Sequence, residues 1–348
     1  MDRLRVQEFM DRFVDIAAGA TTIGLLAIAD RTGLGQFMAD SVARTVEEIA
    51  HETGLQPRYL QEILSGLAAA GIYDYIPETA QFSLASEHAA FVANESSPFF
   101  MGGWFDMIPT LYERLDDLVE ATRNGGGVGF DQFGPGMIRG IARGNEPSQR
   151  ILLASKWLPG VPGLIDRLEG GIRVADVGCG SGAAAAIIAR SFPASEVVGF
   201  DVSVAGIAAA KAGYGDIENL RFELGPLEEM PADPGFDLIT SFDVVHDLGD
   251  PEAGMRHIRQ ALRPDGVFLM MEPAASSNLE DNLTPRGALL YGVSAMHCMT
   301  QSLAAGGQGV GTAWGRQVIE ATARRAGFIT FEHLDGISNS FSDFFVLA

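Results

Sequence analysis

The stretch that decides the fold is VADVGCGSG, residues 174–182, which runs directly into AAAAIIAR, residues 183–190. Its first residues are typical of a buried strand, the glycines of a turn, and the alanine-rich run of a helix. Glycine lets the backbone approach a ligand closely because it carries no side chain. Open parallel sheets bind their ligands at the carboxyl ends of strands, so the turn predicts a ligand-binding edge.

Strands and helices alternate from Ile172 onwards, which predicts a parallel sheet with helices on both faces. The expected strands are residues 172–178, 195–201, 220–225, 236–245, 266–273 and 329–334, and a long insert with a helix precedes the last of these. Residues 339–348 (NSFSDFFVLA) are expected to form an antiparallel edge strand. We therefore expect an α/β, Rossmann-like domain over residues 146–348.

The first half of the chain has a mostly helical pattern. TVEEIAHETGL predicts a short helix from a threonine cap to Gly54, and Pro57 starts a second helix. Two short strands follow around a turn at residues 77–80, which completes the order of a winged helix. Residues 98–122 resemble helices that cover a pocket, and the glycine-rich residues 123–136 are typical of a flexible loop or linker. We expect a winged-helix and dimerisation domain over residues 1–145.

A winged helix binds DNA or serves packing and dimerisation. The second helix has one basic residue, Arg58, and one acidic residue, Glu62, unlike a basic recognition helix. The net charge of −21 also opposes binding to phosphates, so no nucleic-acid partner is expected. The two cysteines, Cys179 and Cys298, form no CxxC pair. No uncharged apolar run of ~20 residues and no signal-peptide pattern occurs, so we expect no membrane span and a cytoplasmic location.

Two carboxylates flank the glycine turn. Asp176 precedes it, where its carboxylate can order the loop or face a positively charged cofactor group. Asp201 ends the next strand, where a carboxylate suits paired ribose hydroxyls because it accepts two hydrogen bonds in a fork. Dinucleotide sites have GxGxxG, whereas the third glycine here comes one residue early.

On these residues the chain resembles the class I S-adenosylmethionine-dependent methyltransferases. The resemblance implies that Asp176, Gly178 and Gly180 line the methionine part of the cofactor. It places Asp201 at the ribose and Val202 beside the adenine. Relatives often have an acidic residue at the adenine amine, but Pro226 stands there in this chain, so Leu227 or a backbone group is expected to replace it. Ser241 and Phe242, at the end of the fourth strand, are expected near the cofactor.

His246 has three interpretations. It is a structural histidine, a general base for an O–H group, or a metal ligand. His297 and Gln301 are four residues apart in an expected helix, so they share a face and form a three-ligand metal site with His246 under the third interpretation. Glu272 ends the fifth strand and faces the same edge in principle.

The pair His246–Asp247 after the fourth strand, behind a winged helix, resembles the caffeate-type methyltransferases, whose histidine deprotonates a phenol. The segments SFDVVHDLGDP and MHCMTQSLA also resemble bacterial α-keto acid C-methyltransferases of the phenylpyruvate type. That resemblance implies a metal held by His246 and His297, and the helical spacing adds Gln301 as a third ligand. The resemblance of the N-terminal half to its family implies that its helices interlock in a homodimer.

The favoured hypothesis is metal-assisted C-methylation beside the ketone of a small α-keto acid, in natural-product or unusual amino-acid biosynthesis. A divalent or trivalent cation (iron, zinc, nickel or cobalt) would stabilise the enolate, and Asp247 would be the base or would orient His246. The alternative is metal-free O-methylation of a small molecule with His246 as base. A third hypothesis is a regulator that binds the cofactor and DNA.

Overall fold

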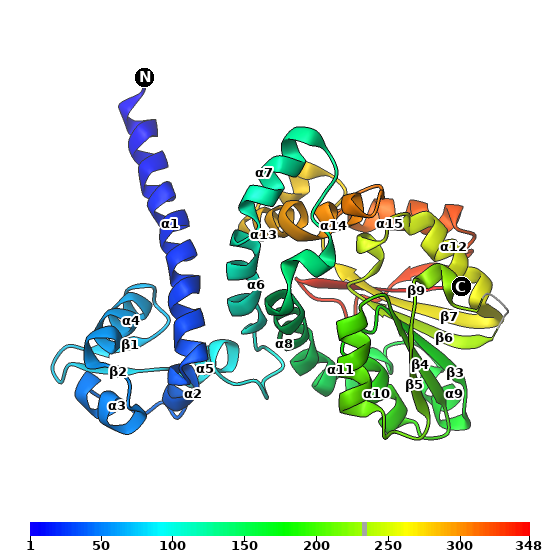
Figure 1. The fold of residues 1–348 in the computed structure, drawn as a ribbon, viewed down its shortest axis with the longest axis horizontal. Coiled ribbons are helices and arrows are strands. Elements are labelled where there is room, and N and C mark those ends of the chain that lie inside the picture. Colours follow the sequence, from blue (N-terminus) through cyan, green and yellow to red (C-terminus); the bar gives the residue numbers. More distant parts are fainter. Residues whose placement is uncertain (232–234) are drawn as a thin grey trace. The chain divides into compact units, whose positions relative to one another are not determined.

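The computed structural model describes residues 1–231 and 235–348 (Figure 1). The chain forms two compact units. Unit 1 comprises Met1–Thr110 and Gly136–Ser148, and unit 2 comprises Leu111–Pro135 and Gln149–Ala348.

Unit 1 is mainly helical and contains the expected winged helix. Its elements are α1 (Arg3–Arg31), α2 (Leu34–Met38), α3 (Val46–Thr53), α4 (Pro57–Ala69), β1 (Asp74–Ile76), β2 (Gln81–Ser83), α5 (Ser86–Val92), and most of α6 (Gly103–Tyr112) and α8 (Pro135–Leu152). The predicted cap is confirmed, since Thr45 and Glu48 form a reciprocal capping box and Gly54 ends α3 at φ 73°. The strands β1 and β2 pair antiparallel, which confirms the hairpin of the wing.

A buried ion-pair cluster ties distant parts of unit 1 together. Nη1 of Arg143, in α8, lies 2.9 Å from both Asp30 of α1 and Asp106 of α6, and Nη2 lies 2.6 Å from Glu95. The side chain of Asp106 is only 2% exposed and also pairs with Arg139 at 2.8 Å. The arginines hold the pKa of Asp106 below its usual value although burial alone would raise it.

The N-terminal helix α1 exposes many apolar side chains. Leu4, Phe9, Met10, Phe13 and Ile16 are each at least 55% exposed. By length and composition α1 is also long and apolar enough to cross a membrane, with a mean hydropathy of 1.5 over a window that is 17% buried. These two observations describe a helix with an apolar surface that nothing in unit 1 covers.

Unit 2 is built on a sheet of seven strands in the order β5-β4-β3-β6-β7-β9-β8 (Figure 1). The strands are β3 (Arg173–Val177), β4 (Glu196–Asp201), β5 (Leu220–Leu224), β6 (Phe236–Phe242), β7 (Leu262–Pro273), β8 (Phe331–His333) and β9 (Ser342–Leu347). The strands β3 to β7 run parallel, which confirms the Rossmann-like prediction, and β9 is antiparallel to its neighbours β7 and β8. The last strand therefore has the expected direction, but β8 rather than β9 is the edge.

The helices and short helical turns of unit 2 lie between these strands. They are α7 (Leu115–Asn124), η1 (Phe130–Phe133), the π-helical η2 (Leu153–Trp157), α9 (Leu164–Gly170), α10 (Ala183–Ser191), α11 (Val204–Tyr214), η3 (Leu227–Glu229), η4 (Val245–Asp247), α12 (Pro251–Ala261), η5 (Leu279–Asn282), α13 (Pro285–Val293), the π-helical η6 (Ser294–Cys298), α14 (Met299–Ala304) and α15 (Gly315–Arg325). The sequence did not predict α15 or the π-helical turns.

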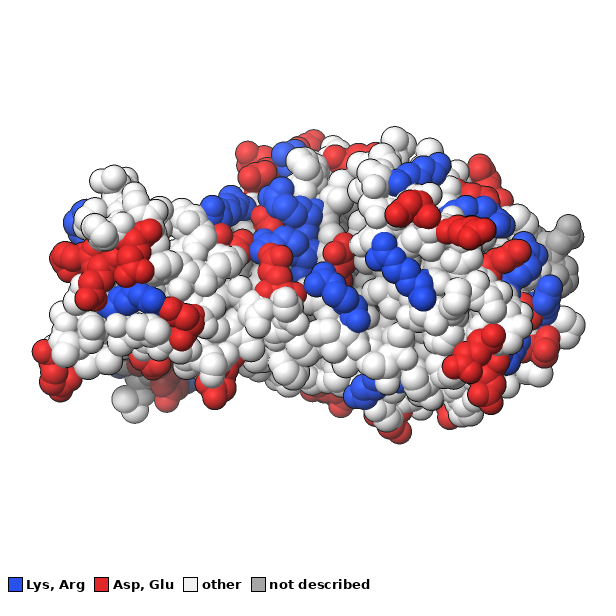
Figure 2. All heavy atoms as spheres, turned by 90° about the horizontal axis from the view of Figure 1, so that it is seen from below, with Lys and Arg blue, Asp and Glu red and all other residues white. Residues whose placement is uncertain are grey.

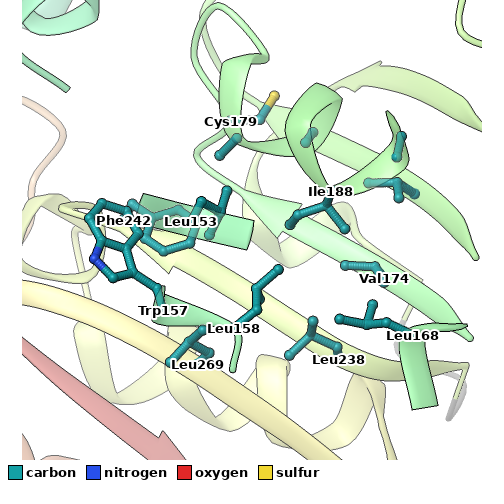
Figure 3. Packing of buried hydrophobic residues seen from close by; sticks show 14 of the residues in the cluster. Leu153, Trp157, Leu158, Leu168, Val174, Cys179, Ile188, Leu238, Phe242 and Leu269 are labelled. Carbon is teal, nitrogen blue, oxygen red and sulfur yellow. The ribbon is translucent and has the colours of Figure 1, made fainter. Parts of the chain in front are cut away.

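Hydrophobic layers cover both faces of the sheet because successive strand residues point to opposite sides. On one face Val174, Leu238 and Leu269 pack against η2, α9, α10 and α11, and Figure 3 shows Trp157 of η2 beside Phe242 and Leu153. On the other face Ala175 and Ile239 pack against α12 and α15. The sheet is therefore closed on both faces, and its carboxyl-end edge is left for binding.

The glycine-rich residues 123–136 are not a loose linker, so that interpretation was wrong. Val128 and Phe133 are 1% and 3% exposed, and the amide of Val128 donates to Thr300 Oγ1 of α14 at 2.8 Å. A side chain at Gly127 would collide with the backbone of Thr300. Glycine permits this close approach, and the segment packs against α14 within unit 2.

Acidic and basic side chains are interspersed on the face shown in Figure 2. In the second helix of the winged helix, α4, Arg58 pairs with Glu62 of the next turn. The helix that would enter a DNA groove thus presents a neutralised charge pair. The absence of a nucleic-acid partner stays a prediction, and this charge distribution agrees with it.

Candidate active site

The glycine turn after β3 is held by hydrogen bonds to the neighbouring strand β4. The amides of Gly178 and Cys179 donate to the carbonyl of Phe200 at 2.8 and 3.0 Å, and the amide of Gly180 donates to Asp201 Oδ2 at 2.7 Å. Gly178 and Gly180 have φ values of 68° and 53°, which favour glycine. A Cβ at Gly178 would also collide with the side chain of Val244, so the turn packs tightly against the end of β6.

Two buried polar atoms at this edge make no close hydrogen bond to the protein. Asp176 is 1% exposed; its Oδ1 accepts from Thr240 Oγ1 at 2.7 Å, while its Oδ2 makes no such bond, although the backbone amide of Ala185 lowers the pKa of the carboxyl. Burial raises the pKa of Asp176 to about 7. Ser241, fully buried on β6, also has an unpaired Oγ. Buried polar groups are normally satisfied, so both atoms indicate a polar, preferably cationic, ligand.

The other predicted cofactor residues lie around the same edge in different environments. Asp201 ends β4, and its Oδ1 also accepts from the amide of Ser203 at 2.7 Å, which leaves further lone pairs for hydroxyl groups. Val202 beside it is 67% exposed. Leu227 is 5% exposed and belongs to the core layer under α12. Phe242, at the end of β6, is 8% exposed, and its ring centroid lies 5.8 Å from that of Trp157.

The central pair of the site is His246 with Glu272, the residue near the end of β7. His246 Nδ1 lies 2.7 Å from Glu272 Oε2, and the two side chains are 3% and 0% exposed. Glu272 also accepts from Trp314 Nε1 at 3.0 Å and, through Oε1, from the amide of Val245 at 3.0 Å. With three donors around it the carboxylate accepts only, so Nδ1 of His246 carries hydrogen and Nε2 faces the site.

Two other carboxylates share the electrostatic environment of this imidazole. Asp247 Oδ1 lies 3.3 Å from His246 Nε2 but makes no hydrogen bond. Burial would lower the pKa of His246, but Asp247 and Glu272 raise it well above its usual 6.5. Asp243 adopts φ 58°, which is rare for a residue with a side chain, and burial raises its pKa to about 7. Three carboxyl groups therefore act on His246, and no lysine or arginine is among the residues that shift the pKa of Asp243.

His297 lies in the π-helical turn η6 and is 3% exposed. Its Nδ1 is 3.6 Å from Cys298 Sγ, its Nε2 has no partner, and the rings of Phe133 and Phe130 meet it edge-on at 4.8 and 6.0 Å. Burial lowers its pKa, with Asp247 and His246 as the charged groups that act on it. Gln301 in α14 also has an unpaired Nε2.

The predicted metal set is only partly brought together. Among the described residues, the potential ligand atoms within 4.8 Å of one another belong to His246, Asp247 and Cys298, and His297 is outside this group. The prediction that His297 and Gln301 share a face assumed a regular α-helix. The chain is π-helical from Ser294 to Cys298, so the i,i+4 rule does not apply there directly.

The sequence does not identify the partners of the two histidines. It indicates Glu272 only as an acidic residue at the end of a strand and predicts no role for Trp314 or Cys298. A glutamate at the end of a strand next to the His246 strand could have been paired with it, because the ends of parallel strands meet at one edge. Cys298 directly follows His297 in sequence, but the π-helical turn that carries both residues has no sequence signal.

Comparisons with known proteins agree with this architecture. Residues 168–318 match the family described as "Methyltransferase domain", and residues 19–94 match the "Rv2258c-like winged HTH domain". The chain is 28% identical over 243 residues to demethylspheroidene O-methyltransferase of Cereibacter sphaeroides, covering 66% of this chain and 62% of that protein. Two other curated relatives are matched over only 38% and 40% of their length.

Two solved structures share the fold over nearly the whole chain. The mitomycin 7-O-methyltransferase MmcR has a TM-score of 0.73 at 17% identity, covering 99% of each chain. Human N-acetylserotonin methyltransferase in complex with S-adenosylmethionine has a TM-score of 0.71 at 16% identity, covering 100% of this chain and 98% of that one. The chain therefore contains a winged helix-turn-helix domain over residues 19–94 and a methyltransferase domain over residues 168–318.

Proposed function

We propose that this protein is an O-methyltransferase for a small molecule, with His246 as the general base. The observation that carries the proposal is the buried pair of His246 and Glu272 at 2.7 Å, beside a strand edge with unpaired polar atoms. The long relative and one structural neighbour are O-methyltransferases by name, which supports oxygen as the acceptor atom.

The residues at the glycine turn fit the cofactor. Asp176 Oδ2 would meet the ammonium group of the methionine part, and Ser241 Oγ would accept or donate the neighbouring hydrogen bond. Asp201 would receive the ribose hydroxyls through its remaining lone pairs. S-Adenosylmethionine supplies a methyl group on a sulfonium, ready for transfer to a nucleophile.

The reaction then needs a deprotonated oxygen. The acceptor hydroxyl donates to His246 Nε2, and its proton moves to that nitrogen as the oxygen forms a bond to the methyl carbon. Bound S-adenosylmethionine would release its methyl carbon with the bond's electron pair left on sulfur, and His246 would pass the proton on to solvent. Glu272 stabilises the imidazolium that forms and holds the ring in the tautomer with a free Nε2.

Metal-assisted C-methylation of an α-keto acid is the second candidate. The unpaired Nε2 of His297 and the close ligand atoms of His246, Asp247 and Cys298 favour a cation at this place. The unpaired atom of Gln301 is its amide nitrogen, which donates hydrogen bonds and does not bind a cation. Nitrogen, oxygen and sulfur ligands suit zinc and similar ions. A bound cation would supply Lewis acidity for ionising a C–H group beside a ketone.

One experiment separates the two candidates. Radiolabelled S-adenosylmethionine is incubated with panels of neutral phenols and of α-keto acids, with and without a chelator, and the metal content is measured on protein made without a nickel column. Chelator-resistant transfer to phenols, lost in His246→Ala, supports the proposal. Stoichiometric metal with transfer only to keto acids would overturn it in favour of the second candidate.

We further propose that the protein is a homodimer joined through α1. Its exposed apolar residues would otherwise remain in water, and large exposed apolar patches mark interaction sites. Light scattering coupled to size exclusion should give twice the monomer mass, and Phe9→Glu with Phe13→Glu should give the monomer mass. A monomeric wild type, or a chain that requires detergent, would refute the dimer.

A further inference from the structure

Asp243 directly follows the last residue of β6, at the edge of the sheet where the glycine turn lies. All seven residues of β6 are buried, whereas Asp243 and Val244 are partly exposed, so the chain reaches solvent at this point. The amide of Asp243 continues the pairing with β7 by donating to the carbonyl of Met271 at 3.0 Å. Asp243 is therefore held at the carboxyl end of the sheet, where parallel sheets bind their ligands.

Along the chain Asp243 stands between the cofactor turn and His246. Val244, the next residue, packs against Gly178 of the turn, and Ser241, with its unpaired Oγ, is two residues before it. On the other side, the charge of His246 acts on the Asp243 carboxyl. Both candidate mechanisms place the methyl acceptor at His246. Because the methyl group must pass from the cofactor to that acceptor, the sulfonium would lie near Asp243.

The backbone conformation of Asp243 is unfavourable, and no local contact explains it. Its φ is 58°, a value that few residues other than glycine adopt. Aspartate tolerates this region mainly where its side chain forms a local hydrogen bond. Here burial and neighbouring charges shift the pKa of Asp243, and no hydrogen bond from the residues that the structure describes contributes to it. The chain thus holds a carboxyl group in a strained place without satisfying it, which is typical of functional sites.

The surroundings of Asp243 carry an excess of negative charge. Glu272 and Asp247 raise the pKa of Asp243, and His246 lowers it. Burial lowers the pKa of His297, so that imidazole adds no positive charge. Even with His246 protonated, the three carboxylates outnumber the single imidazolium, so one further positive charge is favoured here. The sulfonium of S-adenosylmethionine is such a charge, whereas the sulfur of S-adenosylhomocysteine is neutral.

We propose that the carboxylate of Asp243 faces the sulfonium of the cofactor and favours S-adenosylmethionine over S-adenosylhomocysteine by charge. The attraction ends when the methyl group leaves, because the sulfur then becomes neutral, so the same residue favours exchange of the product for fresh cofactor. This inference goes beyond the proposed O-methylation. It rests only on S-adenosylmethionine as the cofactor, because an oxygen or a carbon acceptor would take the methyl group from the same sulfonium.

The test is calorimetric titration of three ligands into the full-length protein at about pH 8, where the Asp243 carboxyl is ionised. S-Adenosylmethionine and sinefungin carry a positive charge at or next to the sulfur position, and S-adenosylhomocysteine does not. Asp243→Asn keeps the size of the side chain and tolerates the backbone conformation. It should lower the affinity for both cationic ligands about tenfold relative to that for S-adenosylhomocysteine, as expected for one close charge pair.

Two further variants separate charge from structure. Asp201→Asn is the matched control, since it removes a carboxylate from the same edge but at the ribose, which all three ligands share. It should weaken the three ligands by the same factor. Asp243→Gly removes the charge and relaxes the backbone, so it should show the same change of ratio as Asp243→Asn and tests the inference if the asparagine variant is unstable.

An unchanged affinity ratio in both Asp243 variants, an equal loss for all three ligands as from a structural role, or no binding to either variant would overturn the inference. A wild type that binds none of the ligands would overturn it together with the cofactor. Methyl transfer is measured separately on the same samples. A charge-dependent ratio without transfer to any hydroxyl group would count against the proposed O-methylation alone, so the two failures are distinguishable.

Discussion

Replacing Glu272 by glutamine gives the most direct test of the proposed base. Glu272 accepts three hydrogen bonds, two at Oε2 from His246 and Trp314 and one at Oε1 from the amide of Val245. Glutamine keeps a single carbonyl oxygen. If that oxygen stays on His246 and Trp314, the amide group faces the Val245 N–H, and two donors oppose each other.

The expected magnitude follows from the charge that is lost. A hydrogen bond to a charged group contributes about 1.5–3 kcal/mol. Lost from the transition state, in which His246 becomes an imidazolium, this corresponds to a roughly 10- to 150-fold lower kcat/KM. Removing the carboxylate also lowers the pKa of His246, so the acid limb of the pH profile should move to lower pH.

The assay is the pH dependence of steady-state methyl transfer, followed as S-adenosylhomocysteine formed. Asp343→Asn is the matched control, because Asp343 is buried opposite Glu272 in the strand pairing of β7 and β9 but pairs with Arg316. The control should lose stability and keep the wild-type acid limb. A Glu272→Gln enzyme with kcat/KM within about twofold of wild type and an unmoved acid limb would refute the role given to the pair.

Three further predictions use other parts of the molecule. Activity should rise with pH through the raised pKa of His246, because only the neutral imidazole is a base. Asp247→Asn should shift that rise to lower pH, and an unshifted rate profile would contradict the role of His246 as the base. Arg143→Met leaves Asp30 and Asp106 buried without their shared partner and should cost about 3–5 kcal/mol in urea unfolding. The more exposed Arg139→Met should cost less, and equal losses would argue against the cluster. Gly178→Ala should weaken S-adenosylmethionine binding at least about tenfold by calorimetry, because φ 68° and the contact with Val244 leave no room for the alanine methyl group. Gly163→Ala is the control, since Gly163 has φ 72° but open space around it, and should leave binding unchanged.

The cofactor edge was predictable from sequence because its signals are local. The glycine turn, Asp176 and Asp201 stand at strand ends that parallel topology brings to one edge, whatever the details of packing. The winged helix was predictable for the same reason, since Thr45, Gly54 and Pro57 each fix an element boundary.

The acceptor side was much less predictable because it depends on irregular backbone and on contacts far apart in sequence. The π-helical turn that carries His297 and Cys298 has no periodic signature. The glycines near residue 127 indicate flexibility by composition, but they permit close packing against Thr300 and carry Phe133 to His297. The same residue type thus has opposite meanings in a loop and at a contact.

The charge of the acceptor and the presence of a cation are coupled questions at this site. Asp243, Asp247 and Glu272 surround His246, and an α-keto acid would add a further negative charge. Such a substrate becomes favourable only if a cation offsets the carboxylates, and that cation would occupy Nε2 of His246, the atom that O-methylation needs free. A neutral hydroxylated acceptor requires no cation and leaves Nε2 of His246 free. Metal content and preference for anionic or neutral acceptors should therefore change together, and a metal-free enzyme that prefers α-keto acids would contradict both candidate mechanisms.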